Sequence, residues 1–190
     1  MKLSVLENAP NVFRFMLSDA SFNSANAIRR IATNSVGSMA IDTVTFYENS
    51  TSIFDEYIAH RLGLVPILTP KGYGENDEVL FSMHADGPAI AYSKDLKSNE
   101  KDVKVANENI PIMKLADGQS LRIEAKAIMG TGTRSSKFQP GIVSYKANEK
   151  GDEFEFYVET FGQMPALEII TRTLGIISES LKEMYKELKK

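Results

Sequence analysis

The stretch FNSANAIRRIATNSVGSMAIDTV, residues 22–44, predicts a helix that runs into a strand. Small and apolar residues recur at helical spacing from about Phe22 to Ser35, and Ser21 is a candidate N-cap directly before them. Gly37 follows the expected end of the helix, where a left-handed residue commonly closes a helix. The next residues, MAIDTVTFYE, alternate apolar and polar side chains with one slip, which permits a bulge. A helix followed at once by a strand is a first indication of an α+β fold.

Strands on both sides of this stretch support that fold class. Residues 2–17 predict two strands around a turn, and residues 120–130 and 152–160 alternate in the same way. Residues 52–66 predict a short helix that a glycine and a proline terminate. Residues 70–110 are the least regular part of the chain. They are rich in charged and amide side chains, so we expect a solvated excursion with one or two edge strands.

The composition excludes several classes of protein. A length of 190 residues suits one domain, or one domain with an insert. The chain carries 22 basic and 25 acidic side chains, so it lacks the basic excess of a protein held mainly by nucleic-acid phosphates. It has no cysteine, which excludes disulfides, thiolate zinc sites, cysteine-ligated iron–sulfur clusters and a cysteine nucleophile. The N-terminal apolar run is too short for a signal peptide, and no apolar run is long enough to span a membrane. We therefore expect a soluble cytoplasmic protein.

The segment PALEIITRTLGIISESLKEMYKELKK, residues 165–190, predicts an amphipathic helix with a narrow apolar stripe. Intervals of three and four residues separate its apolar positions, as along one side of a coiled coil. The stripe consists of Leu167, Ile170, Leu174, Ile177, Leu181, Met184 and Leu188. It either packs on the chain's own sheet, as most amphipathic helices do, or meets a partner protein. A helix of about 25 residues spans roughly 37 Å, more than a small sheet is expected to cover, which favours a partner.

Two adjacent arginines, Arg29 and Arg30, lie in the middle of the helix predicted over residues 22–35. Nucleic acid, solvent or a partner protein would each accommodate them. The acidic balance of the chain argues against nucleic acid, whereas the planar guanidinium group is common at protein interfaces. The residues alone leave solvent and a partner protein open.

No motif in the sequence has the spacing of a catalytic or metal site. GTGTRSSKFQPG, residues 130–141, has the glycines of a phosphate-binding loop, but it lacks both usual spacings, and Pro140 and Gly141 close it where a helix should follow. A small phosphate-binding enzyme is therefore only an alternative. His60 and His84 are far apart in sequence, and no nearby carboxylate pattern completes a metal site. We expect neither catalytic residues nor a metal in this chain.

Five segments together resemble one known family. They are FNSANAIRRIATNSV (22–36), AIDTVTFYENST (40–51), DEYIAHRLGLVPI (55–67), GTGTRSSKFQP (130–140) and FGQMPALEII (161–170). In this order they resemble the D-type chains of archaeal DNA-directed RNA polymerase. That family is akin to the N-terminal region of bacterial polymerase alpha chains and to the third-largest polymerase chain of eukaryotes.

The resemblance implies an α+β fold with two domains. Residues 1–40 and 150–190 would form a discontinuous dimerisation domain, a sheet with two helices, and residues 41–149 an inserted mixed α/β domain. The implied function is that of a non-catalytic assembly platform of DNA-directed RNA polymerase, a nucleotidyltransferase complex active in transcription. The chain would pair with the small L subunit, and the pair would nucleate binding of the large catalytic subunits. Other small polymerase subunits are further expected partners, no direct DNA contact is expected, and a free-standing homodimeric scaffold is the alternative.

The resemblance also assigns two surfaces. Contact with the L subunit is expected from the whole apolar stripe and from three residues of the first helix, namely Phe22, Ile28 and Ala32. Contact with the large subunits is expected from Arg29, Arg30, Arg61, Lys137 and Phe138.

Two features depart from the family pattern. Many relatives carry an insert with a cysteine-ligated iron–sulfur cluster in the middle domain, whereas the corresponding segment here, FSMHADGPAIAYSKDL (81–96), is short and has no cysteine. The expectation is therefore that the chain binds no cofactor. The loop reads RSSK at residues 134–137, where relatives often have a histidine, which leaves the contact role of Ser135 and Ser136 open.

Overall fold

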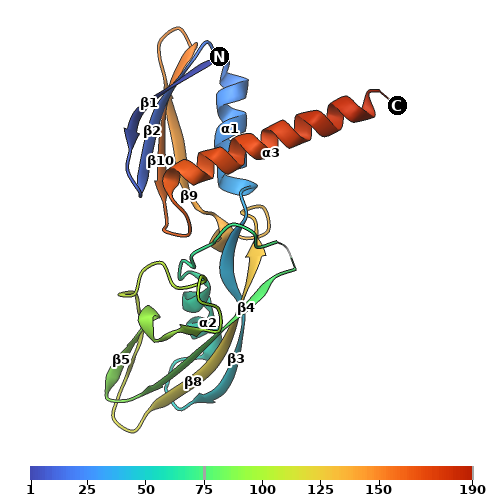
Figure 1. Cartoon of the computed structure of the whole chain (residues 1–190). Helices are drawn as coiled ribbons and strands as arrows, with labels where there is room; N and C mark the ends of the chain where they lie inside the picture. The colour runs from blue at the N-terminus through green and yellow to red at the C-terminus, as the bar shows by residue number, and fades with distance from the viewer. Residues whose placement is uncertain (75, 190) are drawn as a thin grey trace. The chain divides into compact units, whose positions relative to one another are not determined.

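The computed structural model describes residues 1–74 and 76–189 and divides the chain into two compact units (Figure 1). The first unit comprises Met1–Gly37 and Thr131–Lys190, and the second comprises Ser38–Gly130. Helices and antiparallel sheets occur together, which confirms the α+β fold class. The boundary predicted between residues 149 and 150 is wrong, because residues 131–149 include a strand of the first sheet. The boundary predicted after residue 40 also differs, since the first strand of the second unit already begins at Ser38.

The first unit is a four-stranded antiparallel sheet with two helices packed on one face (Figure 1). Its elements are β1 (Lys2–Asn8), β2 (Val12–Ser18), α1 (Phe22–Asn34), β9 (Gly141–Ala147), β10 (Glu153–Thr160) and α3 (Ala166–Glu187). The strand order is β1-β2-β10-β9, so the pairing of β2 with β10 joins the two halves of the chain. Strand β9 pairs with β10 along its whole length, which explains why residues 141–147 belong to this unit.

Alternation along the strands directs aromatic side chains toward the helices. Phe13 and Phe15 of β2 and Phe154 and Phe156 of β10 are buried. The rings of Phe15 and Phe156 are stacked, with centroids 4.7 Å apart. Helix α1 completes this core with its small and apolar face, Ala25, Ile28 and Ala32.

The opposite face of this sheet is polar. Arg14 of β2 donates a hydrogen bond to Glu155 of β10, and its guanidinium also lies 3.6 Å from the carboxylate of Glu7. The hydrogen bond to Glu155 is the main cause that raises the pKa of Arg14 above its ordinary value. Tyr157 donates to Glu159 at 3.0 Å, and this bond raises the pKa of the phenol. Cross-strand pairs such as that of Arg14 with Glu155 help to fix strand register.

The N-cap of α1 is the predicted residue, whereas the C-terminal end of the helix differs from the prediction. The backbone N–H of Ser24 donates to the hydroxyl of Ser21 at 3.2 Å, so Ser21 is the N-cap. The helix ends at Ser35 in a right-handed conformation (φ −113°, ψ −15°). The left-handed closure expected at Gly37 therefore does not occur.

The described residues of the second unit form two antiparallel sheets and one α-helix. Its elements are β3 (Ser38–Asn49), α2 (Asp55–Gly63), β4 (Glu78–Asp86), β5 (Ala89–Tyr92), η1 (Ser93–Asp95), β6 (Lys97–Ser98), β7 (Pro111–Leu115) and β8 (Ser120–Gly130). The sheets have the orders β3-β8-β4-β6 and β5-β7. Strand β4 lies between two neighbours, so residues 70–110 contain an interior strand that the sequence did not predict. The pairing of β3 with β8 shifts register twice, where one bulge was expected.

Candidate protein–protein interface

The first three turns of α3 belong to the core of the first unit. The side chains that pack there are Ala166, Ile169, Ile170, Thr173, Ile176 and Ile177. The backbone N–H of Ala166 donates to the carbonyl of Pro10 at 3.1 Å, which ties the start of the helix to the β1–β2 turn. We call residues 166–177 the inner half of α3.

The C-terminal part of α3 extends past the sheet and α1 (Figure 1). Every residue from Ser178 to Lys189 is exposed, and we call this segment the outer arm. Its apolar side chains have exposed fractions of 61% (Leu181), 63% (Met184), 60% (Tyr185) and 85% (Leu188). Spacings of three and four residues place them on one side of the helix, in line with Leu174, which is 43% exposed. A contiguous apolar surface of this kind marks an interaction site.

This exposed apolar row begins beside a cavity at the edge of the first sheet. The cavity has a volume of about 170 Å³ and lies among β1, β2, α1 and α3. Its lining includes Met1, Leu3, Phe15, Leu17, Ile28 and Leu174. Strand β1 is an edge strand and all of its residues are exposed. Sequence reasoning did not assign Met1 and Leu3 to the interface because they are remote from the stripe in sequence. The alternation of apolar residues along β1 is the sequence feature that could have indicated their role.

Three of the residues predicted to contact the L subunit are buried in the chain's own core. Ile170, Ile28 and Ala32 have exposed fractions of 3%, 6% and 0%. Their side chains lie between the helices and the aromatic face of the sheet, so the prediction of direct partner contact is wrong for the fully buried Ala32. Ile28 and Ile170 also line the cavity beside β1, and their contact with a partner there stays a prediction. Ile177 is half-buried, whereas Phe22 is exposed and packs its ring edge-on against Phe154. The stripe residues that the fold leaves exposed are Leu167, Leu174, Leu181, Met184 and Leu188.

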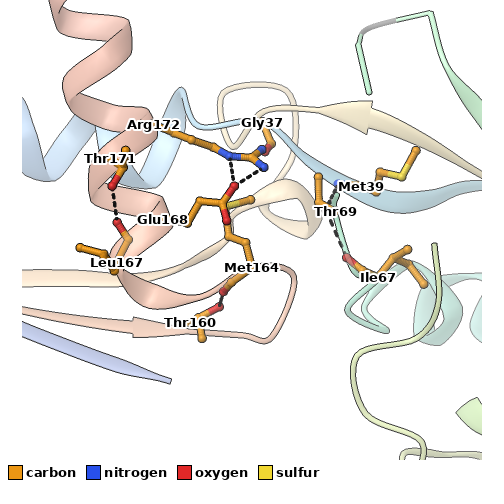
Figure 2. Close-up of polar contacts among 10 residues, drawn as sticks. All are labelled: Gly37, Met39, Ile67, Thr69, Thr160, Met164, Leu167, Glu168, Thr171 and Arg172. Carbon is orange, nitrogen blue, oxygen red and sulfur yellow. Dashed lines mark hydrogen bonds and ion pairs between the residues drawn. The ribbon is translucent and has the colours of Figure 1, made fainter. Parts of the chain in front are cut away.

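Polar contacts fix the beginning of α3 (Figure 2). The guanidinium of Arg172 donates from Nε and Nη2 to one carboxylate oxygen of Glu168, at 3.0 and 2.7 Å, and its Nη1 lies 3.5 Å from the carbonyl oxygen of Gly37. In the turn between β10 and α3, the hydroxyl of Thr160 donates to the carbonyl of Met164 at 2.7 Å. These contacts hold the helix start in place, so that the direction of the outer arm is set by the first unit.

Replacing Arg172 by methionine tests this anchoring. Arg172→Met keeps the apolar stem but removes the bonds to Glu168 and Gly37, and we expect the free energy of unfolding to fall by about 1 kcal/mol, because the pair is largely shielded from solvent. Urea unfolding followed by circular dichroism measures the change. Lys182→Met, on the exposed outer arm, is the matched control and should leave the midpoint unchanged. Equal midpoints for both variants would contradict a role of Arg172 in holding the helix.

The arginine pair of α1 lies in two different environments. Arg29 is half-buried, and its guanidinium donates to the side-chain oxygen of Asn26 at 2.9 Å. Arg30 is exposed, and no hydrogen bond or ion pair joins its side chain to another residue in the described part of the chain. Arg30 is therefore the more available of the two for a partner.

The loop between β8 and β9 has a structural explanation for its glycine. A Cβ atom on Gly132 would lie 2.5 Å from the carbonyl oxygen of Thr33, so only glycine permits this approach to the end of α1. Next to it, the backbone N–H and the hydroxyl of Thr133 both donate to the carbonyl of Asn34 at 3.0 Å. The loop then forms a three-residue 3-10 helix, η2 (Ser136–Phe138), and leads into strand β9, whereas a phosphate-binding loop would lead into an α-helix.

Exposure differs between the two loop residues predicted to contact the large subunits. Phe138 is fully buried, so the prediction that its side chain contacts a partner is wrong. The ammonium group of Lys137 and the guanidinium of Arg134 lie over its ring, 5.2 and 5.5 Å from the centroid. Lys137 is half-buried. The phenylalanine thus supports the loop from beneath, while these two cations lie above it.

Arg61 has a contact within the second unit. Its Nη2 donates to the carbonyl of Pro111 at 2.5 Å, which links α2 to β7. The same helical segment exposes three large side chains that the sequence did not single out, Phe54 (79%), Tyr57 (55%) and Leu64 (57%). Phe54 and Tyr57 lie around the start of α2. Their helical spacing from Leu64 is the sequence feature that could have identified these three residues as one exposed group.

A cavity of about 570 Å³ lies on the second unit, and Tyr47, His84 and Arg122 are among the residues that line it. His84 in its lining lies 3.2 Å from Asp86, and the Arg122 guanidinium lies over the Tyr47 ring, 5.5 Å from its centroid. Within residues 1–74 and 76–189, no group of three or more His, Cys, Asp or Glu side chains is arranged to hold a metal ion. In the same described part of the chain, no helix is both long enough and apolar enough to cross a bilayer.

Comparison with known proteins places these features in a family. Residues 39–144 match the family described as the RNA polymerase Rpb3/RpoA insert domain. The class that the second unit defines is thus that of RNA polymerase insert domains. Subunit Rpo3 of DNA-directed RNA polymerase from Methanocaldococcus jannaschii is 44% identical over 169 residues, which cover 89% of this chain and 86% of the relative. The chain belongs to the Rpo3 family of archaeal DNA-directed RNA polymerase subunits. The resemblance seen in the sequence is confirmed.

Other relatives are longer than this chain. Rpo3 from Pyrococcus furiosus is 44% identical over 153 residues, 77% of this chain and 59% of the relative. Rpo3 from Halobacterium salinarum is 45% identical over 134 residues, 70% of this chain and 54% of the relative. The chain thus spans between half and two thirds of the length of these two relatives.

Proposed function

We propose that this RNA polymerase subunit is a non-catalytic assembly platform that pairs with the small L subunit through the outer arm of α3 and the uncovered β1 edge. The pair then recruits the large catalytic subunits. The observation that carries this proposal is the exposed apolar row of the outer arm, in a chain whose other large apolar side chains mostly lie in two well-packed cores.

Physical magnitudes support a permanent partner. Burying one leucine or methionine side chain is worth about 1.5–3 kcal/mol, so Leu181, Met184 and Leu188 together represent a large free energy that the isolated chain does not gain. Interfaces that stay formed are larger and more apolar than transient ones. The apolar cavity beside β1 would receive a side chain of the partner and continue the same surface toward the sheet.

The remaining partner contacts follow from the other exposed groups. Arg30 of α1 and the cations above Phe138 suit one of the large subunits, and the apolar side chains around α2 suit another polymerase subunit. We further propose that the chain itself contributes no catalytic residue and acts in the cytoplasm as part of the polymerase. The absence of cysteine from the sequence supports the proposal that it holds no iron–sulfur cluster.

Co-expression with the L subunit tests the proposal. The two chains should co-purify and elute as a one-to-one complex by size exclusion with light scattering. A homodimer of this chain that excludes L would favour the scaffold alternative, and a monomer in the presence of L would contradict the proposal.

The arginine pair gives a second test. Arg29→Ala combined with Arg30→Ala should change the unfolding midpoint and L pairing little, because neither side chain belongs to the core. Capture of the large subunits by the heterodimer with L should weaken, since exposed arginines at an interface are often energetically important. A pull-down of the large subunits measures this. Loss of L pairing with unchanged capture of the large subunits would show that the assignment of this face is wrong.

Anaerobic reconstitution with iron and sulfide tests the cofactor proposal. No stoichiometric absorbance of a cluster should develop on the purified chain, because cluster ligation in this family uses thiolates and the sequence has none. A relative that carries the cysteine-bearing insert is the positive control. A stable cluster on the present chain would contradict the proposal.

A further inference from the structure

Helix α3 consists of two parts that differ in how they are supported. In the inner half, apolar side chains pack on the aromatic core, and Arg172 adds polar contacts. In the outer arm every side chain is exposed, and the two core clusters of the described residues include no residue after Ile177. The helical state of the arm therefore depends on its own backbone hydrogen bonds and on contacts within the arm, such as that of Lys189 over the Tyr185 ring.

The residues around the start of the outer arm have low helix propensity. Gly175, Ser178 and Ser180 fall within six positions, and glycine and serine are less favourable in helices than alanine. A Cβ on Gly175 would meet no atom within 4 Å, so packing within the chain does not require a glycine there. Its neighbours one turn away, Thr171 and Glu179, are polar.

The energetics of helix formation determine how stable the helical state of the outer arm is in the free chain. The inner half supplies the nucleus, so the arm needs only propagation, but each added residue near the free end gains little in water. Segments with few buried contacts and exposed backbone hydrogen bonds open with free energies near zero. The apolar side chains of the arm gain burial only when a partner covers them.

We propose that the outer arm is only partly helical in the free chain and completes its helix when it pairs with its partner, so that pairing is coupled to folding of this segment. This inference rests on the proposed pairing with the L subunit. It adds that the arm's helix propensity, and not its contacts alone, sets the affinity of the pair.

Hydrogen exchange of the free chain tests the first half of the proposal. Amides of residues 180–187 should exchange at least about 100-fold faster than those of residues 169–177, as expected for a segment without tertiary support. After addition of purified L, the same arm amides should slow by at least about tenfold, whereas those of the inner half should change less. This comparison uses the full chain in both states.

A matched pair of variants tests the second half. Glu179→Ala and Glu179→Gly both remove the same exposed carboxylate, but they differ in helix propensity by about 1 kcal/mol, equivalent to about a fivefold change in an equilibrium constant. If the arm folds on pairing, Glu179→Gly should raise Kd about fivefold relative to Glu179→Ala. If the arm is already helical in the free chain, the two Kd values should be equal, because the glycine would then affect free and bound states alike. Lys186→Ala and Lys186→Gly repeat the comparison further along the arm.

The outcomes separate this inference from the proposed function. Arm amides as protected as the inner half in the free chain, or equal Kd values for the alanine and glycine variants, would overturn the coupling and leave the pairing with L intact. A pair that forms without added protection of the arm would do the same. Failure of the wild-type chain to bind L would overturn the proposed function together with the coupling, whatever the exchange of the free arm.

Discussion

Replacement of Leu181 and Met184 together by aspartate is expected to abolish pairing with the L subunit and to leave the chain folded. Both side chains are more than 60% exposed in the isolated chain, so the core does not depend on them. In the pair, two carboxylates would be buried without a partner, and burial of an unpaired charge costs several kcal/mol. Kd should therefore rise by at least about 1,000-fold, beyond detection in a co-purification assay, at a cost of roughly 2 kcal/mol for each position.

The control also introduces two carboxylates, but at positions outside the apolar row, where each replaces an exposed lysine. Lys182→Asp combined with Lys186→Asp changes exposed positions between the apolar ones, and its effect on Kd should stay within about tenfold, because exposed charges contribute little. Circular dichroism of both double variants should match the wild type. Pairing of the Leu181 and Met184 double variant at wild-type yield would show that the outer arm is not the interface.

Replacement of Phe156 by alanine is expected to have the largest effect on stability. Phe156 is fully buried, stacks on Phe15, and lies 5.4 Å from the Tyr145 ring, centroid to centroid. The cavity left behind should cost about 3–5 kcal/mol and lower the midpoint of the thermal transition of the first unit by at least about 12 °C. Differential scanning calorimetry measures the change.

The adjacent residue provides the control for this core. Tyr157 points to the polar face of the same strand, and Tyr157→Phe removes only the hydroxyl that donates to Glu159. Its midpoint should shift by no more than about 2 °C, since an exposed hydrogen bond contributes little. Similar losses for both variants would mean that the aromatic layer does not hold the first unit together.

The sequence predicts which segments form helices and strands better than it predicts which of their side chains are buried. The bounds of β1, β2, α1 and α3 follow from alternation, helical spacing and caps, all of which are local signals. The local sequence does not determine which positions of the stripe are buried, because their burial depends on how far the sheet extends under the helix. Ile170 lies over the sheet and Leu181 lies beyond it, although both occupy the same stripe.

Long-range pairing explains the other errors. Residues 141–147 alternate like any strand, and only their pairing with β10 assigns β9 to the first sheet. The sequence predicts an accessible Phe138 in a polar loop, but its side chain is buried beneath Lys137 and Arg134. At the start of α2, Ser52 and Asp55 have the spacing of a capping box. The Asp55 carboxylate instead accepts a hydrogen bond from Asn49, and Phe54 occupies the N-cap without a side-chain bond. Neither the burial of Phe138 nor the hydrogen bond between Asn49 and Asp55 can be predicted from the local sequence.

A photo-crosslinking residue in place of Leu181 tests whether the outer arm of α3 meets the L subunit. In the assembled polymerase, irradiation should join this position to L, while the same residue in place of Tyr157, on the polar face of the sheet, should not reach L. Crosslinks from position 181 only to a second copy of this chain, or only to one of the large subunits, would contradict the account.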